Sequence, residues 1–164
     1  MLGTKDKKIN YLNFKCDEYN IPKKVCQGIY VIESTYRNVF FRMIENIATI
    51  LGIIFNYIFK IPLRNYTIGC CQVGISSILY LSGFYSYEHI THIKKLTLAE
   101  IVVILKSMHY KNNMDLLCKK ILFYYEKYVY LHNMNELQAA IIIGQLYNGN
   151  YIYGLKLQEI VQHS

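Results

Sequence analysis

The sequence predicts a mainly α-helical fold with at most a short β-hairpin. Only 2 of the 164 residues are proline, apolar residues recur at three- and four-residue spacing, and two segments carry helix-capping signals. The composition, 53% hydrophobic and 18% charged, excludes a disordered or low-complexity chain. A chain of this length buries roughly 70% of the surface that its unfolded form exposes. We therefore expect one domain over residues 21–164, preceded by a polar N-terminal arm over residues 1–20.

The first half of that domain contains two predicted helices. Pro22 suits the first turn of a helix whose apolar residues keep helical spacing as far as Glu33. A strongly apolar helical insertion follows over residues 38–60, and its stretch from Asn46 to Phe59 carries no charge. That stretch is 14 residues long, which as a helix reaches about 21 Å, against the roughly 30 Å of a bilayer core. We therefore expect the helix to be buried rather than to span a membrane, with a partner or a bilayer surface as the alternative.

The second half is divided by turn and capping signals. The segment Asn65–Ile68 is expected to be extended or half of a hairpin, and residues 72–81 are expected to be helical. The run Thr97–Glu100 forms a capping box ahead of an apolar helix, and Asn113 is expected to cap the helix after it. The last predicted elements are a helix over residues 137–146, a turn over 147–150 and a helix over 155–162.

The formal net charge is +7, from 18 Lys and Arg against 11 Asp and Glu. Such a balance favours a polyanionic partner, which leaves nucleic acid, anionic lipid and bacterial wall polymer as classes. Because the positive charges form no dense run and no recognised motif accompanies them, we expect no nucleic-acid partner. The basic N-terminus has no apolar core behind it, so no signal peptide is visible and the localisation stays open.

The cysteines give no sign of a metal centre or a disulfide framework. There are five, an odd number, with no C-x-x-C pair and no histidine at zinc-finger spacing. We expect reduced cysteines that serve as small hydrophobic side chains, and neither a metal nor a cofactor.

Among the acidic residues, Glu33 stands out because it follows the apolar run Ile29–Ile32 at the end of a predicted helix. Desolvation and the negative end of the helix dipole both raise the pKa of a carboxyl group, which is what a general acid requires. Arg37, four residues on, argues the other way, because an ion pair would keep Glu33 ionised.

Three blocks of sequence resemble those of lytic transglycosylases and goose-type lysozymes. The helix that ends in Glu33-Ser34 is similar to the catalytic helix of that family. The run Gly-Cys-Cys-Gln at 69–72 has the spacing of its Gly-Leu-Met-Gln motif, and Leu-Tyr-Asn-Gly-Asn at 146–150 is similar to its Ala-Tyr-Asn-Ala-Gly. The blocks come in family order and span most of the chain. They depart from the family in the long apolar helix over 38–60, which intervenes where the family usually has a short loop with Asn-Pro.

This resemblance implies a lysozyme-like helical fold that cleaves the peptidoglycan glycan strand between N-acetylmuramic acid and N-acetylglucosamine. Under it, Glu33 would protonate the glycosidic oxygen and then act as base, and Ser34 would position the substrate. Gln72 would hydrogen-bond the sugar chain. Tyr147 would orient the Glu33 carboxyl through its hydroxyl, and Asn148 would fix the turn that brings Tyr147 there.

A second catalytic carboxylate is not evident. No Asp or Glu occurs between Ile61 and Tyr87, the segment expected to face Glu33, and Glu45 is explained as an i,i+3 partner of Arg42. The resemblance therefore favours a single-acid reaction in which the N-acetyl and 6-hydroxyl groups of the sugar replace that carboxylate and yield a 1,6-anhydro product.

The alternative is a non-catalytic helical protein that binds a membrane or a protein partner through Asn46–Phe59. Such a protein would keep a lysozyme-like frame without turning over glycan. The two hypotheses differ in whether Glu33 is needed for an activity and whether the apolar helix is needed for an association.

Overall fold

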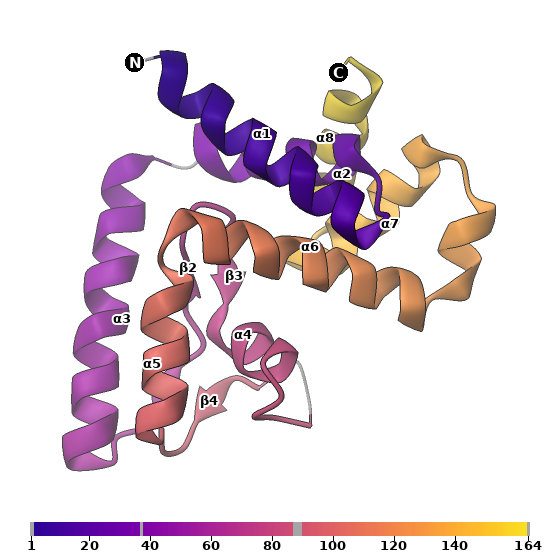
Figure 1. The fold of residues 1–164 in the computed structure, drawn as a ribbon. Helices are drawn as coiled ribbons and strands as arrows, with labels where there is room; N and C mark the ends of the chain where they lie inside the picture. The colour runs from indigo at the N-terminus through magenta and orange to yellow at the C-terminus, as the bar shows by residue number, and fades with distance from the viewer. Residues whose placement is uncertain (1, 37, 87–89, 164) are drawn as a thin grey trace. The chain divides into compact units, whose positions relative to one another are not determined.

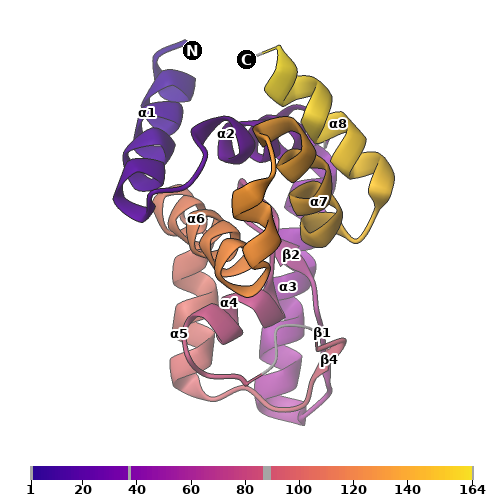
Figure 2. The same cartoon turned by 90° about the vertical axis from the view of Figure 1, so that its right-hand side faces the viewer.

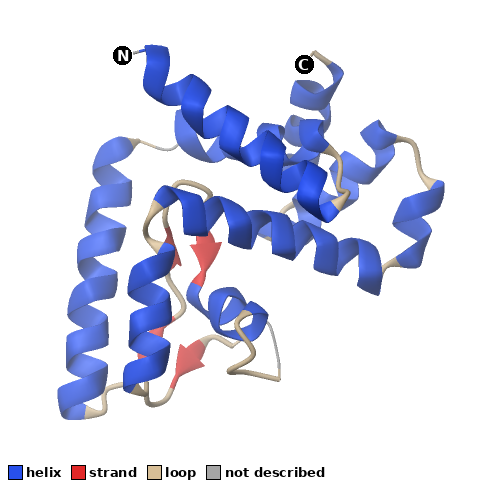
Figure 3. Cartoon of the chain, in the orientation of Figure 1, coloured by secondary structure: helices blue, strands red, loops and turns tan. Residues whose placement is uncertain are grey.

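The computed structural model describes residues 2–36, 38–86 and 90–163, and it confirms the mainly α-helical fold with a short β-hairpin (Figures 1 and 3). Within those ranges the α-helices are α1 (Leu2–Tyr19), α2 (Lys23–Val31), α3 (Val39–Phe59), α4 (Ile75–Leu81), α5 (Leu98–Ser107), α6 (Tyr110–Lys127), α7 (Glu136–Asn148) and α8 (Tyr151–Gln162). A π-helix η1 (Ile32–Tyr36) and a 3-10 helix η2 (Val129–Asn133) add to them. The strands are β1 (Leu63–Arg64), β2 (Thr67–Ile68), β3 (Val73–Gly74) and β4 (His92–Ile93).

The chain divides into two compact units. Unit 1 comprises Met1–Ser34 and Leu117–Ser164, and unit 2 comprises Thr35–Leu116, so that the boundary falls within α6. This division differs from the predicted arm followed by one domain. Each unit is described by itself.

The first helix belongs to the core of unit 1. The segment expected to be an arm is the helix α1, which packs on α2, and the side chains of Leu12 and Cys16 are fully buried. Sequence patterning missed this helix because only a few of its residues face inward and the rest are polar. The N-terminal segment is therefore a helix, and two buried positions four apart are enough to hold it against the rest of unit 1.

Helices α7 and α8 make the most extensive helix pair in unit 1, and glycines permit their close approach (Figure 2). A Cβ at Gly154 would collide with the backbone carbonyl of Ile141, and one at Gly144 would lie 2.7 Å from the Gly154 Cα. The connection between the helices is tight because Gly149 adopts φ 78° and Asn150 caps α8 by accepting the Ile152 N–H at 2.9 Å. This packing determines where the side chains of α8 point.

Unit 2 contains two small antiparallel pairs. Thr67 pairs with Gly74 and Ile68 with Val73, which confirms a hairpin at the predicted extended segment. Strand β1 pairs with β4 through Leu63 opposite Ile93. The predicted capping box is also present, because Thr97 and Glu100 each hydrogen-bond the other's backbone N–H.

Helix α3 has the reverse of the expected burial. Apart from Ile53, which is buried, its described large apolar side chains are exposed: Phe40, Phe41, Met43, Ile44, Ile47, Ile50, Leu51, Ile54, Phe55, Tyr57, Ile58 and Phe59. Thr49 and Asn56 are fully buried, and the Oδ1 of Asn46 and Oγ1 of Thr49 have no hydrogen-bond partner among the described residues. The prediction of a buried apolar helix is therefore wrong. The inward stripe at i, i+3, i+7 and i+10 consists of Asn46, Thr49, Ile53 and Asn56, three of which are polar, and the other large apolar residues cover the rest of the surface.

One buried amide fastens the C-terminal half of α3 within unit 2. The Nδ2 of Asn56 donates to the carbonyls of Ile61, Ile93 and Lys94 at 2.9–3.2 Å, and its Oδ1 accepts the Leu96 N–H at 2.8 Å. Asn56 thereby joins α3 to the strand β4 and the segment after it.

Candidate functional site

Glu33 lies in the π-helix that continues α2, and its side chain is only 5% exposed. Single π turns arise where an extra residue is accommodated in a helix, and they occur frequently at functional sites. The neighbouring Ile32 is also buried. The structure therefore places a carboxyl group in an apolar setting at the end of the predicted helix.

A hydrogen bond to this carboxyl comes from α8. The Tyr153 hydroxyl donates to Glu33 Oε1 at 2.9 Å, and the two residues are 120 positions apart in the chain. The Tyr147 ring stacks on that of Tyr153, with centroids 6.3 Å apart and an interplanar angle of 27°. Tyr153 thus links the end of α2 to the α7–α8 pair inside unit 1.

A buried lysine lies beside Tyr147. The Lys120 ammonium lies 4.9 Å from the ring centroid of Tyr147 and 5.8 Å from that of Tyr124, and the residue is 5% exposed. Cation–π contacts of this kind are worth about 2 kcal/mol when they are desolvated. The Tyr124 hydroxyl donates to the Leu146 carbonyl at 3.0 Å, which holds α6 to the end of α7. We call Glu33, Tyr153, Tyr147 and Lys120 the Glu33 cluster.

The structure brings two of the predicted site residues into this cluster, Glu33 and Tyr147, and adds Tyr153. Sequence reasoning gave Tyr147 the contact that the Tyr153 hydroxyl makes. In the sequence, Tyr153 is marked only by its position just after the turn at residues 147–150. With 17 tyrosines in the chain, that position alone does not single it out. Lys120 was missed because a lysine inside a helix is normally a solvated residue.

Ser34 and Asn148 have local positions in unit 1. The Ser34 hydroxyl donates to the Val31 carbonyl at 3.4 Å, within the same stretch of helix. Asn148 is the exposed last residue of α7, and the hydrogen bonds that fix the following turn are made by Gly149 and Asn150. Arg37, considered as an ion-pair partner of Glu33, lies outside the described residues.

Gln72 lies in unit 2, where it stabilises the turn of the β2–β3 hairpin. Its backbone has φ 54°, its Nε2 donates to the Gly69 carbonyl at 2.9 Å, and its Oε1 accepts from the Thr67 hydroxyl at 2.7 Å. The side chain is 4% exposed. The predicted contact of Gln72 with a sugar stays a prediction, and the hydrogen bonds here give it a role in the turn.

Asn113 of α6 fixes the same turn from outside. Its Oδ1 accepts the Cys71 N–H at 2.7 Å and its Nδ2 donates to the Ile68 carbonyl at 3.0 Å. Gly69 has φ 80°, and a Cβ there would collide with the Asn113 amide. Asn113 therefore lies inside α6, not at the start of a helix as predicted. Its side-chain amide does not cap a helix but hydrogen-bonds the turn of the β2–β3 hairpin.

Among the described residues, one group of side chains is arranged to hold a metal ion. The thiols of Cys16, Cys26 and Cys118 in unit 1 converge, although these residues come from three different helices.

Comparison with family models, curated proteins and solved structures found no match for the chain. The argument about function consequently depends on the residues themselves.

Proposed function

We propose that the protein is a peptidoglycan-cleaving enzyme, a lytic transglycosylase or lysozyme-like muramidase, in which Glu33 is the single acid and base. The observation that carries the proposal is the buried Glu33 carboxyl held by the Tyr153 hydroxyl at the end of α2. A buried, oriented carboxyl group with a hydrogen-bond donor is the arrangement that proton transfer to a glycosidic oxygen requires. The resemblance in three ordered blocks of sequence supplies the substrate class.

In this reaction the Glu33 carboxyl gives its proton to the glycosidic oxygen as the C–O bond breaks. The charge that develops at the anomeric carbon is met by the N-acetyl group of the same sugar. The Glu33 carboxylate then takes the proton from the attacking 6-hydroxyl, which leaves a 1,6-anhydro end, or from a water molecule, which leaves a reducing end. Glu33 is protonated again at the end of the cycle.

The other predicted residues act around this carboxyl or on the glycan. Tyr153 is a positioning residue for Glu33, and Tyr147 holds the Tyr153 ring by stacking. Ser34 contacts the substrate beside Glu33 in the proposal, and Asn148 belongs to the turn between α7 and α8. Gln72 lies in unit 2, where it stabilises the hairpin turn, and its contact with the glycan stays a prediction.

The direct test measures turnover of purified peptidoglycan by the full chain, with the sugar ends identified by mass spectrometry. We expect Glu33→Gln to lower turnover by at least 10³-fold, because the acid and the base are lost together. The matched control is Glu159→Gln, an exposed glutamate on α8, which should keep wild-type turnover. Activity that survives Glu33→Gln excludes the proposal.

A second test addresses the Tyr153 hydroxyl. Tyr153→Phe removes the hydrogen bond to Glu33 and keeps the ring that stacks on Tyr147. We expect kcat to fall roughly tenfold while KM changes little, together with a displaced acidic limb of the pH–rate profile. An unchanged pH profile would mean that the hydroxyl only packs.

The exposed apolar surface of α3 favours a second candidate function, a non-catalytic protein that docks on an anionic membrane. The window Phe40–Phe59 has a mean hydropathy of 1.3 and is only 17% buried, and by length and composition it is the one helix among the described residues that can cross a bilayer. The 21 residues of α3 extend about 32 Å, because the helix continues beyond the uncharged stretch that the sequence argument considered. Exposed Lys60, Lys94 and Lys95 lie at or near the C-terminal end of the helix, where they complement anionic headgroups.

Vesicle sedimentation tests this candidate. Association of the full chain with anionic vesicles should be lost in Ile54→Lys, although the variant gains positive charge, because the substitution places an ammonium group on the apolar surface. The matched control is Ile152→Lys, an equally polar change at an exposed isoleucine of α8. Absence of vesicle binding by the wild-type chain, or an equal loss in both variants, excludes the membrane function.

A further inference from the structure

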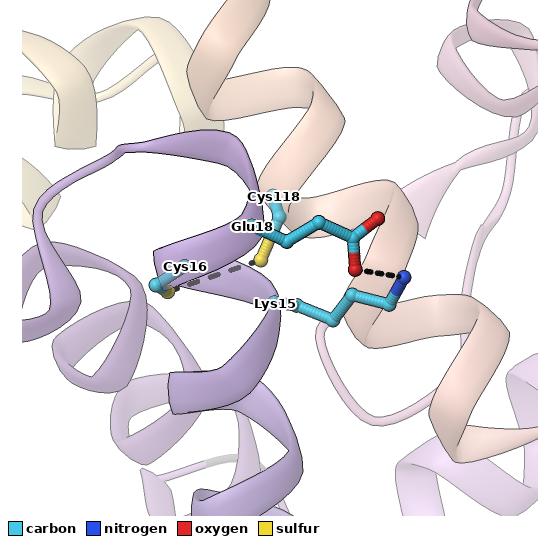
Figure 4. A network of polar contacts seen from close by, with 4 residues as sticks. All are labelled: Lys15, Cys16, Glu18 and Cys118. Atoms are coloured by element: carbon cyan, nitrogen blue, oxygen red, sulfur yellow. Dashed lines mark hydrogen bonds and ion pairs between the residues drawn. The ribbon is translucent and has the colours of Figure 1, made fainter.

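Three cysteines from three helices of unit 1 place their sulfur atoms together. Cys16 of α1, Cys26 of α2 and Cys118 of α6 have Sγ atoms that all lie within 4.8 Å of one another. The Sγ atoms of Cys16 and Cys118 are 3.9 Å apart, and Figure 4 shows this pair. Each of the three side chains is fully buried. The other two cysteines, Cys70 and Cys71, belong to unit 2.

The spacing of these sulfur atoms matches a three-coordinate metal site. A metal ion about 2.3 Å from each of three thiolates in a plane separates the sulfurs by about 4.0 Å. The Cys16–Cys118 distance already has this value, and the third thiol needs to move by less than about 1 Å. Close packing of two helices explains a single contact between two sulfur atoms. Here three sulfur atoms from three helices lie close enough to bind the same ion.

We propose that Cys16, Cys26 and Cys118 bind one Cu(I) ion as a three-sulfur site. Soft thiolate ligands select Cu(I) and Zn²⁺ over harder cations, so the ligand type leaves these two. Zn²⁺ takes four ligands, or three ligands and a water molecule. No His, Asp, Glu or further Cys among the described side chains joins the three, and the complete burial of the sulfurs leaves a water ligand no access. Three ligands without a fourth suit Cu(I).

Proton release accompanies binding. Each Cu–S bond replaces an S–H bond, and the protons pass to solvent. Loss of one proton leaves the cluster neutral, and each further loss adds one negative charge.

The test uses the full chain, kept anaerobic and reduced so that no disulfide forms. Cu(I) is supplied as the complex of a chromophoric chelator, and Zn²⁺ is supplied in parallel with a chromophoric zinc indicator. We expect the wild-type chain to take one equivalent of Cu(I) and no Zn²⁺ at the same competitor concentration. Its melting temperature should rise with added Cu(I), because the ion binds the folded state.

The variant Cys26→Ala should bind Cu(I) at least about 100-fold more weakly. Its matched control is Cys71→Ala, which also truncates a fully buried cysteine and should keep one equivalent. X-ray absorption on the copper-loaded wild-type chain should report three sulfur neighbours, and this readout does not depend on a variant that folds. The proposal is overturned by retention of Zn²⁺ over Cu(I), by equal loss in both variants, or by two sulfur neighbours.

Discussion

Helices α7 and α8 of unit 1 and helix α3 of unit 2 are all rich in apolar residues but bury different kinds of side chain. In the α7–α8 pair, small residues such as Ala140, Gly144 and Gly154 are buried and allow the helices to approach closely. In α3, the buried stripe is mostly polar, with Ile53 as its apolar member, and most of the bulky apolar side chains are outside. The comparison teaches that hydrophobic content does not identify a core helix. Whether a helix is buried depends on the residues along its inward stripe, and only the contacts in the folded chain show which stripe is inward.

Two adjacent isoleucines of α3 give the sharpest test of this contrast. Ile53 is 5% exposed and Ile54 is 44% exposed. We expect Ile53→Lys to lower the free energy of unfolding by about 4 kcal/mol, because it buries an unpaired charge. Ile54→Lys should change it by less than about 0.5 kcal/mol, as surface substitutions do. Urea unfolding followed by circular dichroism measures both, and equal losses would contradict the assignment of the inward stripe.

The glycine contact between α7 and α8 is the next largest effect. Gly154→Ala should cost about 3 kcal/mol, because its methyl group meets the backbone carbonyl of Ile141, which moves only with the helix. The matched control is Gly74→Ala in unit 2, where the nearest atom, on the flexible Asn65 side chain, lies 3.5 Å from the added Cβ. That control should stay within about 1 kcal/mol of wild type. A tolerated alanine at 154 would show that the helices can separate without loss.

Helix α3 is held in unit 2 by the hydrogen bonds of the buried Asn56 side chain. Asn56→Ala should cost about 2 kcal/mol, because it leaves the buried Leu96 N–H and several carbonyls without the Asn56 amide. Asn112→Ala serves as the control, because its one hydrogen bond, to the Lys106 carbonyl, is exposed and should be worth less than about 0.5 kcal/mol. The same denaturation measurement distinguishes them, and a neutral Asn56→Ala would mean that water replaces the amide.

The sequence predicted the local features of this fold and missed those that depend on distant residues. Thr97 with Glu100 and the hairpin at Asn65–Ile68 are local, since the residues involved are close in the chain and their hydrogen bonds follow from residue type. The burial of α3 was misjudged because its inward stripe is fixed by partners such as the carbonyls of Ile93 and Lys94, almost 40 residues away. The α1 helix was missed because its residues are polar on average, and the contacts of its few buried residues, such as Leu12 and Cys16, form only in the folded chain.

The candidate site shows the same division. Glu33 was identified from its apolar neighbours in the chain, and the structure places it in a buried π-helix. Tyr153, Lys120 and the Cys16–Cys118 contact were not foreseen, because each depends on helices that are far apart in sequence and meet only in the folded unit. Spacing rules identify ligands on one helix or loop, and these residues lie on several.

The last expected effect concerns the phenol of Tyr125, which is buried in unit 1, and it depends on pH. Burial, then the charges of Cys26 and Glu136, raise the pKa of Tyr125 to about 12, against about 10 in an unfolded chain. Between these pH values the unfolded chain releases a proton that the folded chain keeps, so rising pH favours unfolding. The stabilisation from this phenol is fully present below pH 10 and is lost as pH rises towards 12. Tyr125→Phe should therefore lose stability less steeply than wild type over that interval in thermal melts, whereas Tyr151→Phe, an exposed tyrosine, should follow the wild-type slope.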